Sequence, residues 1–264
     1  MDFVRRVMDS APAEGEFELF WLGQAGFVCK APGGKLLAID PYFSDYVQRI
    51  IPEEGFGFKR LSPPPCRADD LPFDALLISH EHGDHFDVDA MLAMLKNERM
   101  HIYTNKVVYA ELLGMGVPEA RLHPLEKGRS IPLWEGLRLT AMDCDHGELA
   151  PEALGFLLDF SFGKLYYAGD TAFTPDRLKA AVQAKPDVAI LPINGAYGNL
   201  NGVSAAQYAA LLQAKVCVPC HFWTFPLHHG DPQEIIDHLP KLAKNCVLRL
   251  LCQGEGFRYG CEGV

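Results

Sequence analysis

The stretch that decides the fold is ALLISHEHGDHFD, residues 75–87. Its first part, Ala75–Ser79, is apolar and predicts a buried strand. A cluster of histidines and acidic residues follows this strand without a break. His80 and His82 are two residues apart, so their side chains point the same way in an extended segment. Metal-binding side chains at the end of a strand predict a metal site at one edge of a sheet.

The second part of the cluster adds Asp84 and His85, which diverge unless the chain turns at Gly83. Imidazole nitrogens and carboxylate oxygens are the ligands that Zn²⁺ and Mn²⁺ use in proteins. Two such ligand pairs suit two metal ions that share one site and activate a bridging water. A solvated polar loop is the plainer alternative, but the position directly after an apolar strand favours the metal site.

Later strands also end in metal-binding side chains. His146 comes just after LRLTAMD, Asp170 follows LYYAG, and His221 follows VCVPC. Taken singly, each histidine could be a loop or core residue, and Asp170 could cap a helix. Their joint occurrence at strand ends predicts the additional ligands that two metal ions need.

Apolar runs with strand character recur along the whole chain. They are Phe17–Leu22, Gly26–Lys30, Lys35–Ile39, Ala75–Ser79, His101–Thr104, Leu137–Met142, Gly155–Phe160, Lys164–Ala168, Val188–Pro192, Val216–His221 and Val247–Leu251. The first half is rich in strands and short hairpins, and the second half alternates strands with helices. This mixture predicts an α/β fold whose sheets carry helices on their outer faces. The chain length suits one large domain that spans residues 1–264, or two small ones.

Helical periodicity appears between several of these strands. The predicted helices are Val88–Lys96, Val107–Leu113, Pro175–Ala184, Ser204–Ala214 and Pro232–Leu239. We expect Ser204 to be an N-cap, and Asp231 followed by Pro232 is typical of a helix entrance. The stretch Pro52–Pro72 has no such pattern. Its aromatic residues and prolines favour an ordered flap over a disordered segment.

Composition narrows the class of protein. The chain has 264 residues, of which 48% are hydrophobic, and a net charge of −10, so a nucleic-acid partner is not expected. The N-terminal residues lack the apolar core of a signal peptide, and no run approaches the roughly 20 apolar residues of a membrane span. We therefore expect a cytoplasmic protein with no membrane partner. Cys217 and Cys220 form a C-x-x-C pattern, but an apolar run favours core thiols over a redox pair.

Several other side chains are candidates for contact with a small molecule. Lys59, Arg60, Asn194, Tyr197 and Asn199 lie in predicted loops that could line a pocket, or they could be ordinary surface residues. A phosphorylated substrate would favour arginine or lysine there.

The metal-binding pattern resembles that of the metallo-β-lactamase superfamily, from about Phe17 to the end of the chain. The resemblance implies a four-layered αββα sandwich, with two β-sheets packed face to face and helices outside. It assigns the following roles: His80, His82 and His146 hold one ion, Asp84, His85 and His221 hold the second, and Asp170 bridges the two. It also matches Asp40 to an aspartate that supports the metal loop from behind.

A narrower resemblance concerns the segments FWLGQAGFVCKAPGGKLLAIDPYFSDY, GFKRLSPPP, HGELAPEALGFLLDF and PINGAYGNLN. They are similar to the branch that contains L-ascorbate-6-phosphate lactonase. This implies a dinuclear hydrolase of a small ester or lactone, including a phosphorylated sugar lactone, that uses a metal-bridging hydroxide. The ions would be Zn²⁺ or Mn²⁺, and Fe²⁺ also fits the ligands. The small-molecule substrate is expected to be anionic, and a homo-oligomer is compatible with the resemblance.

Proton transfer in such a reaction is assigned to three residues. Asp84 would orient the nucleophile or take its proton. His228 and His229 could donate a proton to the leaving group, and an ordinary polar turn is the alternative for both.

Other functions stay open at this stage. The main alternative is a metal-dependent phosphodiesterase that acts on small cyclic or nucleotide phosphodiesters, because the same kind of site cuts both bonds. An RNA-cutting enzyme would need an added domain or a basic surface. An iron-binding protein without hydrolase activity, and a regulatory protein with a decayed site, fit the complete ligand set less well.

Overall fold

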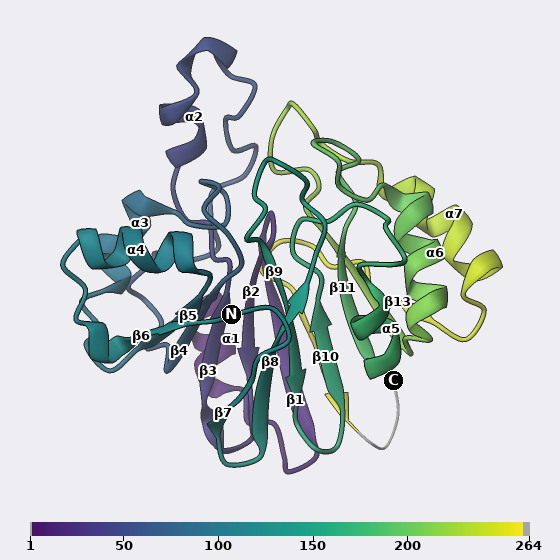
Figure 1. The fold of residues 1–264 in the computed structure, drawn as a ribbon, viewed down its shortest axis with the longest axis horizontal. Helices are drawn as coiled ribbons and strands as arrows, with labels where there is room; N and C mark the ends of the chain where they lie inside the picture. Colours follow the sequence, from purple (N-terminus) through teal and green to yellow (C-terminus); the bar gives the residue numbers. More distant parts are fainter. Residues whose placement is uncertain (1, 261–264) are drawn as a thin grey trace. The chain divides into compact units, whose positions relative to one another are not determined.

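The computed structural model describes residues 2–260 (Figure 1). Its contacts divide the chain into two compact units. The first unit consists of Met1–Leu125, Trp223–Leu227 and Cys252–Tyr259, and the second consists of Glu126–Phe222, His228–Leu251 and Gly260–Val264. Each unit is built around one seven-stranded sheet. No helix in the described range combines the length and apolarity needed to cross a membrane.

The sheet of the first unit has the strand order β14-β1-β2-β3-β4-β5-β6. Its strands are β1 (Glu16–Gly23), β2 (Gly26–Lys30), β3 (Leu36–Ile39), β4 (Ala75–Ile78), β5 (His101–Thr104), β6 (Leu122–Pro124) and β14 (Gly256–Gly260). β1 to β3 are antiparallel neighbours, whereas β3 to β6 run parallel. The parallel part explains why β4 is apolar along its whole length, since helices pack on sheets of this kind.

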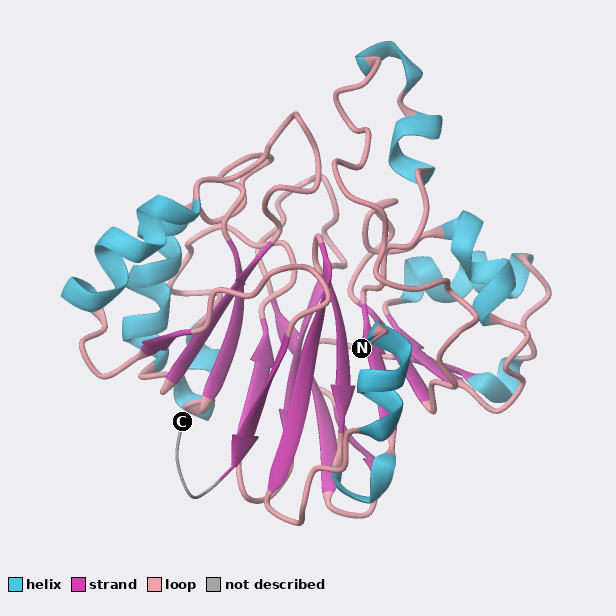
Figure 2. Ribbon diagram, turned by 180° about the vertical axis from the view of Figure 1, so that it is seen from behind, coloured by secondary structure: helices cyan, strands magenta, loops and turns pink. Residues whose placement is uncertain are grey.

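Helices α1 (Phe3–Asp9), α3 (Val88–Met94) and α4 (Lys106–Gly114) pack on one face of this sheet. The first unit also contains α2 (Tyr46–Ile50) and the short 3₁₀ turns η1 (Pro32–Gly34), η2 (Pro52–Glu54) and η3 (Glu119–Arg121). Leu76 of β4 shares one core cluster with Met91 of α3 and Val108 of α4. Figure 2 shows α1, beside the N-terminus, lying along the strands of its own unit.

The stretch Pro52–Pro72 is part of an arm between β3 and β4, and Figure 1 shows that α2 of this arm stands away from the sheet of its unit. At the base of the arm, Phe58 and Tyr42 are buried together with Phe225. The expectation of an ordered flap is therefore met by aromatic packing.

The sheet of the second unit has the order β13-β12-β11-β10-β9-β8-β7. Its strands are β7 (Ser130–Trp134), β8 (Leu137–Asp143), β9 (Leu154–Asp159), β10 (Lys164–Tyr167), β11 (Val188–Pro192), β12 (Val216–Cys220) and β13 (Val247–Leu248), and its helices are α5 (Lys179–Ala184), α6 (Gly202–Leu212) and α7 (Pro232–Leu242). β10 to β13 are parallel, and the remaining neighbours are antiparallel. The carboxyl ends of β10, β11 and β12 therefore meet at one edge.

The structure corrects several predicted elements. Ser204 is not the N-cap of α6, because Asn201 caps that helix and Ser204 completes a capping box with it. The predicted helix Pro175–Ala184 begins only at Lys179, after a turn. Asp231 does cap α7, with Pro232 in the first turn, as predicted. β6, β7, β14, α1 and α2 were not predicted from the sequence.

Candidate metal centre

The histidine-rich segment after β4 forms a tight turn in the first unit. The backbone N–H groups of His85 and Phe86 both donate to the carbonyl of His82, at 2.9 and 2.7 Å. The chain thus turns at Gly83, and this turn keeps the side chains of Asp84 and His85 from diverging. A Cβ on Gly83 would lie 2.9 Å from the ring of Tyr46, so the turn is packed closely against α2 of the arm.

This turn gathers the metal-binding side chains of the first unit. His80 Nε2 lies 3.0 Å from His82 Nδ1, and Asp84 Oδ2 lies 3.7 Å from His85 Nε2. The rings of His80 and His85 are 4.1 Å apart between centroids. Nitrogen and oxygen atoms of His80, His85 and Asp40 all lie within 4.8 Å of one another. The predicted residues of this segment are therefore brought together.

Asp40 supports the turn from the end of β3. This buried carboxylate accepts hydrogen bonds from the backbone N–H of Ser79 at 2.7 Å and from the Ser79 hydroxyl. Its second oxygen lies 2.7 Å from His85 Nδ1. A carboxylate at one ring nitrogen fixes the orientation of an imidazole and directs the other nitrogen, Nε2, to a metal ion. This is the supporting role that the resemblance predicts for Asp40.

Gln24 is a site residue that sequence reasoning missed. It lies between β1 and β2 with a positive φ of 50° and is almost completely buried. Its side-chain Nε2 donates to Asp84 Oδ2 at 2.8 Å, and its backbone N–H donates to the Thr224 hydroxyl at 3.0 Å. One oxygen of Asp84 is thereby held by an amide. The only sequence signal was the segment WLGQAG, which gave Gln24 no role.

A second cluster lies in the second unit, where three strands end. His146 follows β8, Asp170 follows β10 and His221 follows β12. Asp170 Oδ2 is 3.8 Å from His146 Nε2, and Asp170 Oδ1 is 3.3 Å from His221 Nε2. All three residues are buried. The two oxygens of Asp170 thus face two different imidazoles.

Asp145 fixes the loop that carries His146. Its carboxylate accepts from the Thr174 hydroxyl at 2.5 Å and from Arg177 Nη1 at 2.5 Å, and its backbone N–H donates to the Thr171 hydroxyl at 2.8 Å. The Thr174 hydroxyl holds the pKa of Asp145 below its usual value, and the charge of Arg177 adds to this against the effect of burial. Hydrogen bonds and the ion pair of Asp145 with Arg177 therefore connect the loop after β8 to the segment after β10.

The donor atoms of both clusters fit divalent metal ions. They are imidazole nitrogens and carboxylate oxygens in buried or half-buried positions, a set that suits Zn²⁺, Mn²⁺ and Fe²⁺. The histidine contact with Asp40 supplies the outer support that metal ligands in proteins usually have.

The proposed proton donors, His228 and His229, lie between β12 and α7. The ring of His228 packs 4.4 Å from that of Tyr197, and His228 has a positive φ of 56°. His229 is exposed and makes no hydrogen bond or ion pair within residues 2–260. The structure therefore gives His228 a packed position and leaves the role of His229 a prediction.

Two cations that could bind a phosphate have structural partners. Lys59 forms an ion pair with Asp45. Arg60 is buried, donates from Nη1 to the carbonyl of Tyr42 at 2.8 Å and stacks on the Tyr42 ring at 4.8 Å. Both side chains thus hold the arm together.

The cysteine prediction is confirmed for the described residues. Cys217 and Cys220 are both buried, and burial raises the pKa of Cys217 well above its usual value. They form part of the core of β12.

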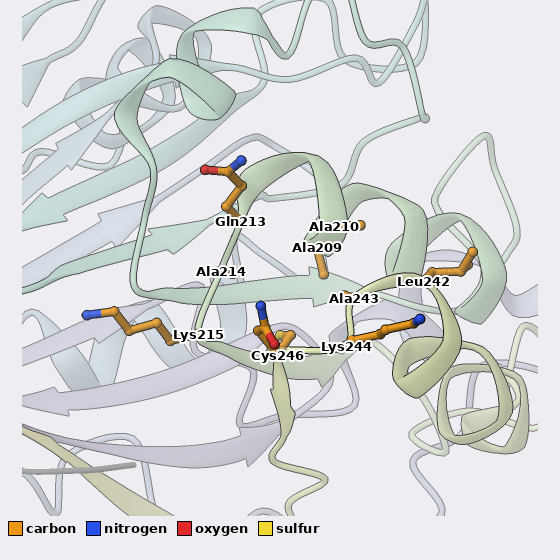
Figure 3. A pocket seen from close by; sticks show the side chains of 10 residues that line it. Ala209, Ala210, Gln213, Ala214, Lys215, Leu242, Ala243, Lys244 and Cys246 are labelled. Atoms are coloured by element: carbon orange, nitrogen blue, oxygen red, sulfur yellow. The ribbon is translucent and has the colours of Figure 1, made fainter.

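A cavity of about 380 Å³ lies in the second unit between the C-terminal ends of α6 and α7 (Figure 3). Its lining includes Gln213, Lys244 and Cys246, and Lys215, which also lines it, pairs with Asp187 at 2.8 Å. The predicted metal ligands are not among its lining residues. The candidate site is therefore defined by the two side-chain clusters.

Comparison with known proteins gives consistent matches over most of the chain. A family model described as the beta-lactamase superfamily domain matches residues 37–222. A UPF0173 metal-dependent hydrolase of Myxococcus xanthus is 31% identical over 245 residues, covering 88% of this chain and 80% of the relative. One of Rubrobacter xylanophilus is 30% identical over 252 residues, covering 91% and 96%.

Solved structures also match most of the chain. Igni18, a metallo hydrolase of Ignicoccus hospitalis, aligns with a TM-score of 0.72 at 22% identity and covers 92% of this chain and 98% of its own. The isothiocyanate hydrolase from Delia radicum gut bacteria aligns with a TM-score of 0.71 at 21% identity and covers 92% and 99%. At this identity the structural likeness concerns the fold.

Proposed function

Because the chain belongs to the metallo-β-lactamase superfamily and is a metal-dependent hydrolase, we propose that it cleaves small esters or lactones. The same membership confirms the predicted α/β fold class. We propose phosphorylated sugar lactones as one group of substrates, following the narrower resemblance to the lactonase branch. The observation that best supports this proposal is the position of Asp170. Its two carboxylate oxygens lie 3.8 and 3.3 Å from two different histidines, as expected for a carboxylate that would bridge two metal ions.

The proposed metal centre uses the ligands of both clusters. Its members are His80, His82, Asp84, His85, His146, Asp170 and His221. Two divalent ions bound there would lower the pKa of a water molecule and polarise the substrate carbonyl. The positive charge of two divalent metal ions would also attract an anionic substrate.

The remaining steps belong to side chains of this protein. Gln24 donates to one oxygen of Asp84 at 2.8 Å and so fixes the carboxylate that would orient the attacking water or take its proton. His228 and His229 are the proposed donors of a proton to the leaving group. The ring of His228 packs 4.4 Å from that of Tyr197, which limits its motion.

The experiment that tests this function combines metal content with a hydrolysis screen. We expect about two ions per chain in a paired site, and turnover of lactones or sugar-phosphate lactones that is lost in Asp84→Ala. Asp237→Asn, on the exposed face of α7, is the matched control and should keep full activity. Wild-type turnover by Asp84→Ala on every substrate would contradict the proposed role of Asp84.

The competing candidate is a phosphodiesterase of small cyclic or nucleotide phosphodiesters. The screen therefore includes bis-p-nitrophenyl phosphate and cyclic nucleotides. It also includes an isothiocyanate, since one protein of the same fold carries the name isothiocyanate hydrolase. Turnover restricted to phosphodiesters would keep the metal site and overturn the ester assignment.

A further inference from the structure

We infer that Asn194 and Asn199 bind an uncharged, hydroxylated part of the substrate. Both lie in the segment between β11 and α6, and we call residues 194–201 of this segment the asparagine loop. The inference rests on the proposed function for the existence of a substrate at this edge of the sheet. It adds the chemistry by which the part of the substrate away from the reacting carbonyl is recognised.

The side chains of these two residues are buried without hydrogen bonds. Asn194 is 8% exposed and Asn199 is 9% exposed. Within residues 2–260, the side-chain oxygen and nitrogen of each amide have no hydrogen-bond partner. Buried polar atoms are nearly always satisfied in native proteins, and leaving them unsatisfied is costly. Four such atoms in one short loop therefore indicate that a ligand satisfies them.

The fold of the loop does not depend on these two amides. Its backbone is closed by hydrogen bonds from Gly195 N–H to the Leu200 carbonyl and from Leu200 N–H to the Thr171 carbonyl, each 2.9 Å. The neighbouring Asn201 shows the structural use of such a side chain, because it accepts from Ser204 N–H at 2.9 Å and caps α6. Asn194 and Asn199 make no corresponding bond.

The loop lies beside the metal-binding residues of its own unit. In the second sheet, β11 lies between β10 and β12, and all three strands are parallel. Asn194 follows β11 at the edge where Asp170 follows β10 and His221 follows β12. The bond from Leu200 to Thr171 brings the far side of the loop next to Asp170 as well. Ligands of parallel sheets bind at this carboxyl edge.

The amides select the chemical class of the ligand. Each carboxamide offers an acceptor oxygen and a nitrogen with two donors. Hydroxyl groups donate and accept, so two or more of them can satisfy both amides. A phosphate or carboxylate only accepts and would be repelled by the two oxygens. The loop sequence, NGAYGNLN, also contains no lysine or arginine.

A ligand can reach the two amides only if the asparagine loop changes its conformation locally. Their oxygen and nitrogen atoms are covered in this structure. The tip of the loop is accessible, because Tyr197 is 53% exposed. A hydroxylated ligand would take the place of some of the atoms that now bury the side chains of Asn194 and Asn199.

The test uses Asn194→Leu and Asn199→Leu with two lactones that share one ring. Ribonolactone carries hydroxyl groups and γ-butyrolactone does not. We expect kcat/KM for ribonolactone to fall about 10-fold or more in each variant, because a lost hydrogen bond to a bound hydroxyl weakens transition-state binding. The value for γ-butyrolactone should not change. The Tm should stay the same or rise, because leucine has the same branched shape as asparagine and replaces the unsatisfied oxygen and nitrogen with methyl groups.

Asn97→Leu is the matched control, because its amide donates to the Phe73 carbonyl at 2.6 Å. This variant should lower the Tm and leave the ratio of the two lactone activities unchanged. An equal loss on both lactones in the loop variants, or a lower Tm with an unchanged ratio, would overturn the inference. The second result would mean that ordered water satisfies the amides.

Failure of the proposed function can be separated from failure of this inference. If neither lactone is hydrolysed, binding of ribitol to the metal-loaded protein is measured by ligand-observed NMR. Binding that is lost in Asn194→Leu and Asn199→Leu would support the asparagine loop as a hydroxyl-binding site without any lactonase activity. Absence of ribitol binding, or equal binding by all variants, would overturn the inference.

Discussion

Gln24 decides how one carboxylate of the metal turn is held. Its Nε2 donates to Asp84 at 2.8 Å, while its backbone is fixed by Thr224. Residues that orient metal ligands in this way typically change affinity or activity 10- to 100-fold when they are lost. The orientation of Asp84, a proposed metal ligand, therefore depends on the side-chain amide of Gln24.

We expect Gln24→Met to lower kcat about 10- to 100-fold. Methionine keeps the length of the side chain and removes the donor, so Asp84 loses its fixed orientation while the substrate contacts remain. KM and the Tm should change little. Steady-state kinetics and metal content of the purified variant check this. Gln233→Met, at the exposed start of α7, is the control, and unchanged kcat in Gln24→Met would contradict the positioning role.

Residue types were more predictable than their contacts. The sequence indicated the metal-binding side chains because histidine and aspartate follow apolar strands in a recognisable pattern. It could not indicate Gln24, whose partner Asp84 lies 60 residues away in the chain. The same holds for Arg60, whose hydrogen bond to the backbone of Tyr42, 18 residues away, has no signal in the sequence.

At the scale of elements, burial explains which predictions succeeded. His101–Thr104 and Val188–Pro192 were predicted with their observed bounds, because both strands are buried along all or nearly all of their length. Ser130–Trp134 was missed, because this edge strand has no fully buried residue. α2 was missed because five residues are too few to show a helical period.

Helix packing at Gly202 gives a prediction about stability. A Cβ at this position would lie 2.5 Å from Glu234 Cβ and 2.6 Å from the backbone nitrogen of Ile235. Gly202→Ala must therefore push α6 away from α7, and we expect it to lower the free energy of unfolding by about 1–3 kcal/mol. Thermal denaturation would show this as a fall in Tm of about 2–4 °C per kcal/mol.

Gly114 at the end of α4 is the matched control. A Cβ there would meet nothing within 4 Å in the described part of the chain. Gly114→Ala should leave the Tm unchanged or raise it, because alanine reduces the entropy of the unfolded chain by about 0.4–1 kcal/mol. A similar loss of stability in both alanine variants would contradict the packing argument.

At the scale of the whole molecule, the chain order does not reveal the division into units. Trp223–Leu227 follows the last predicted ligand, yet it belongs to the first unit. The reason is contact with distant residues, since Thr224 binds the backbone of Gln24 across 200 positions of sequence. Local periodicity carries no information about contacts of this range, whereas the α/β class follows from the alternation of strands and helices.

If both clusters form one dinuclear centre, as proposed, the number of metal ions lost should depend on which ligand is replaced. Asp170→Asn keeps the shape of the bridging residue and removes its charge, so both ions should bind more weakly. His82→Ala should mainly weaken the ion assigned to His80, His82 and His146. Elemental analysis after dialysis would then give less metal for Asp170→Asn than for His82→Ala.

The same variants should differ in stability when metal is removed. A ligand at 100 times its dissociation constant stabilises the folded state by about 2.7 kcal/mol, so a chelator should lower the Tm of the wild-type protein by several degrees. Asp170→Asn should lose most of this difference, because it binds both ions poorly even when metal is present. Asp237→Asn should show the full wild-type difference. If Asp170→Asn kept two ions per chain and the wild-type response to the chelator, each cluster would have to bind metal on its own, and the shared centre would be wrong.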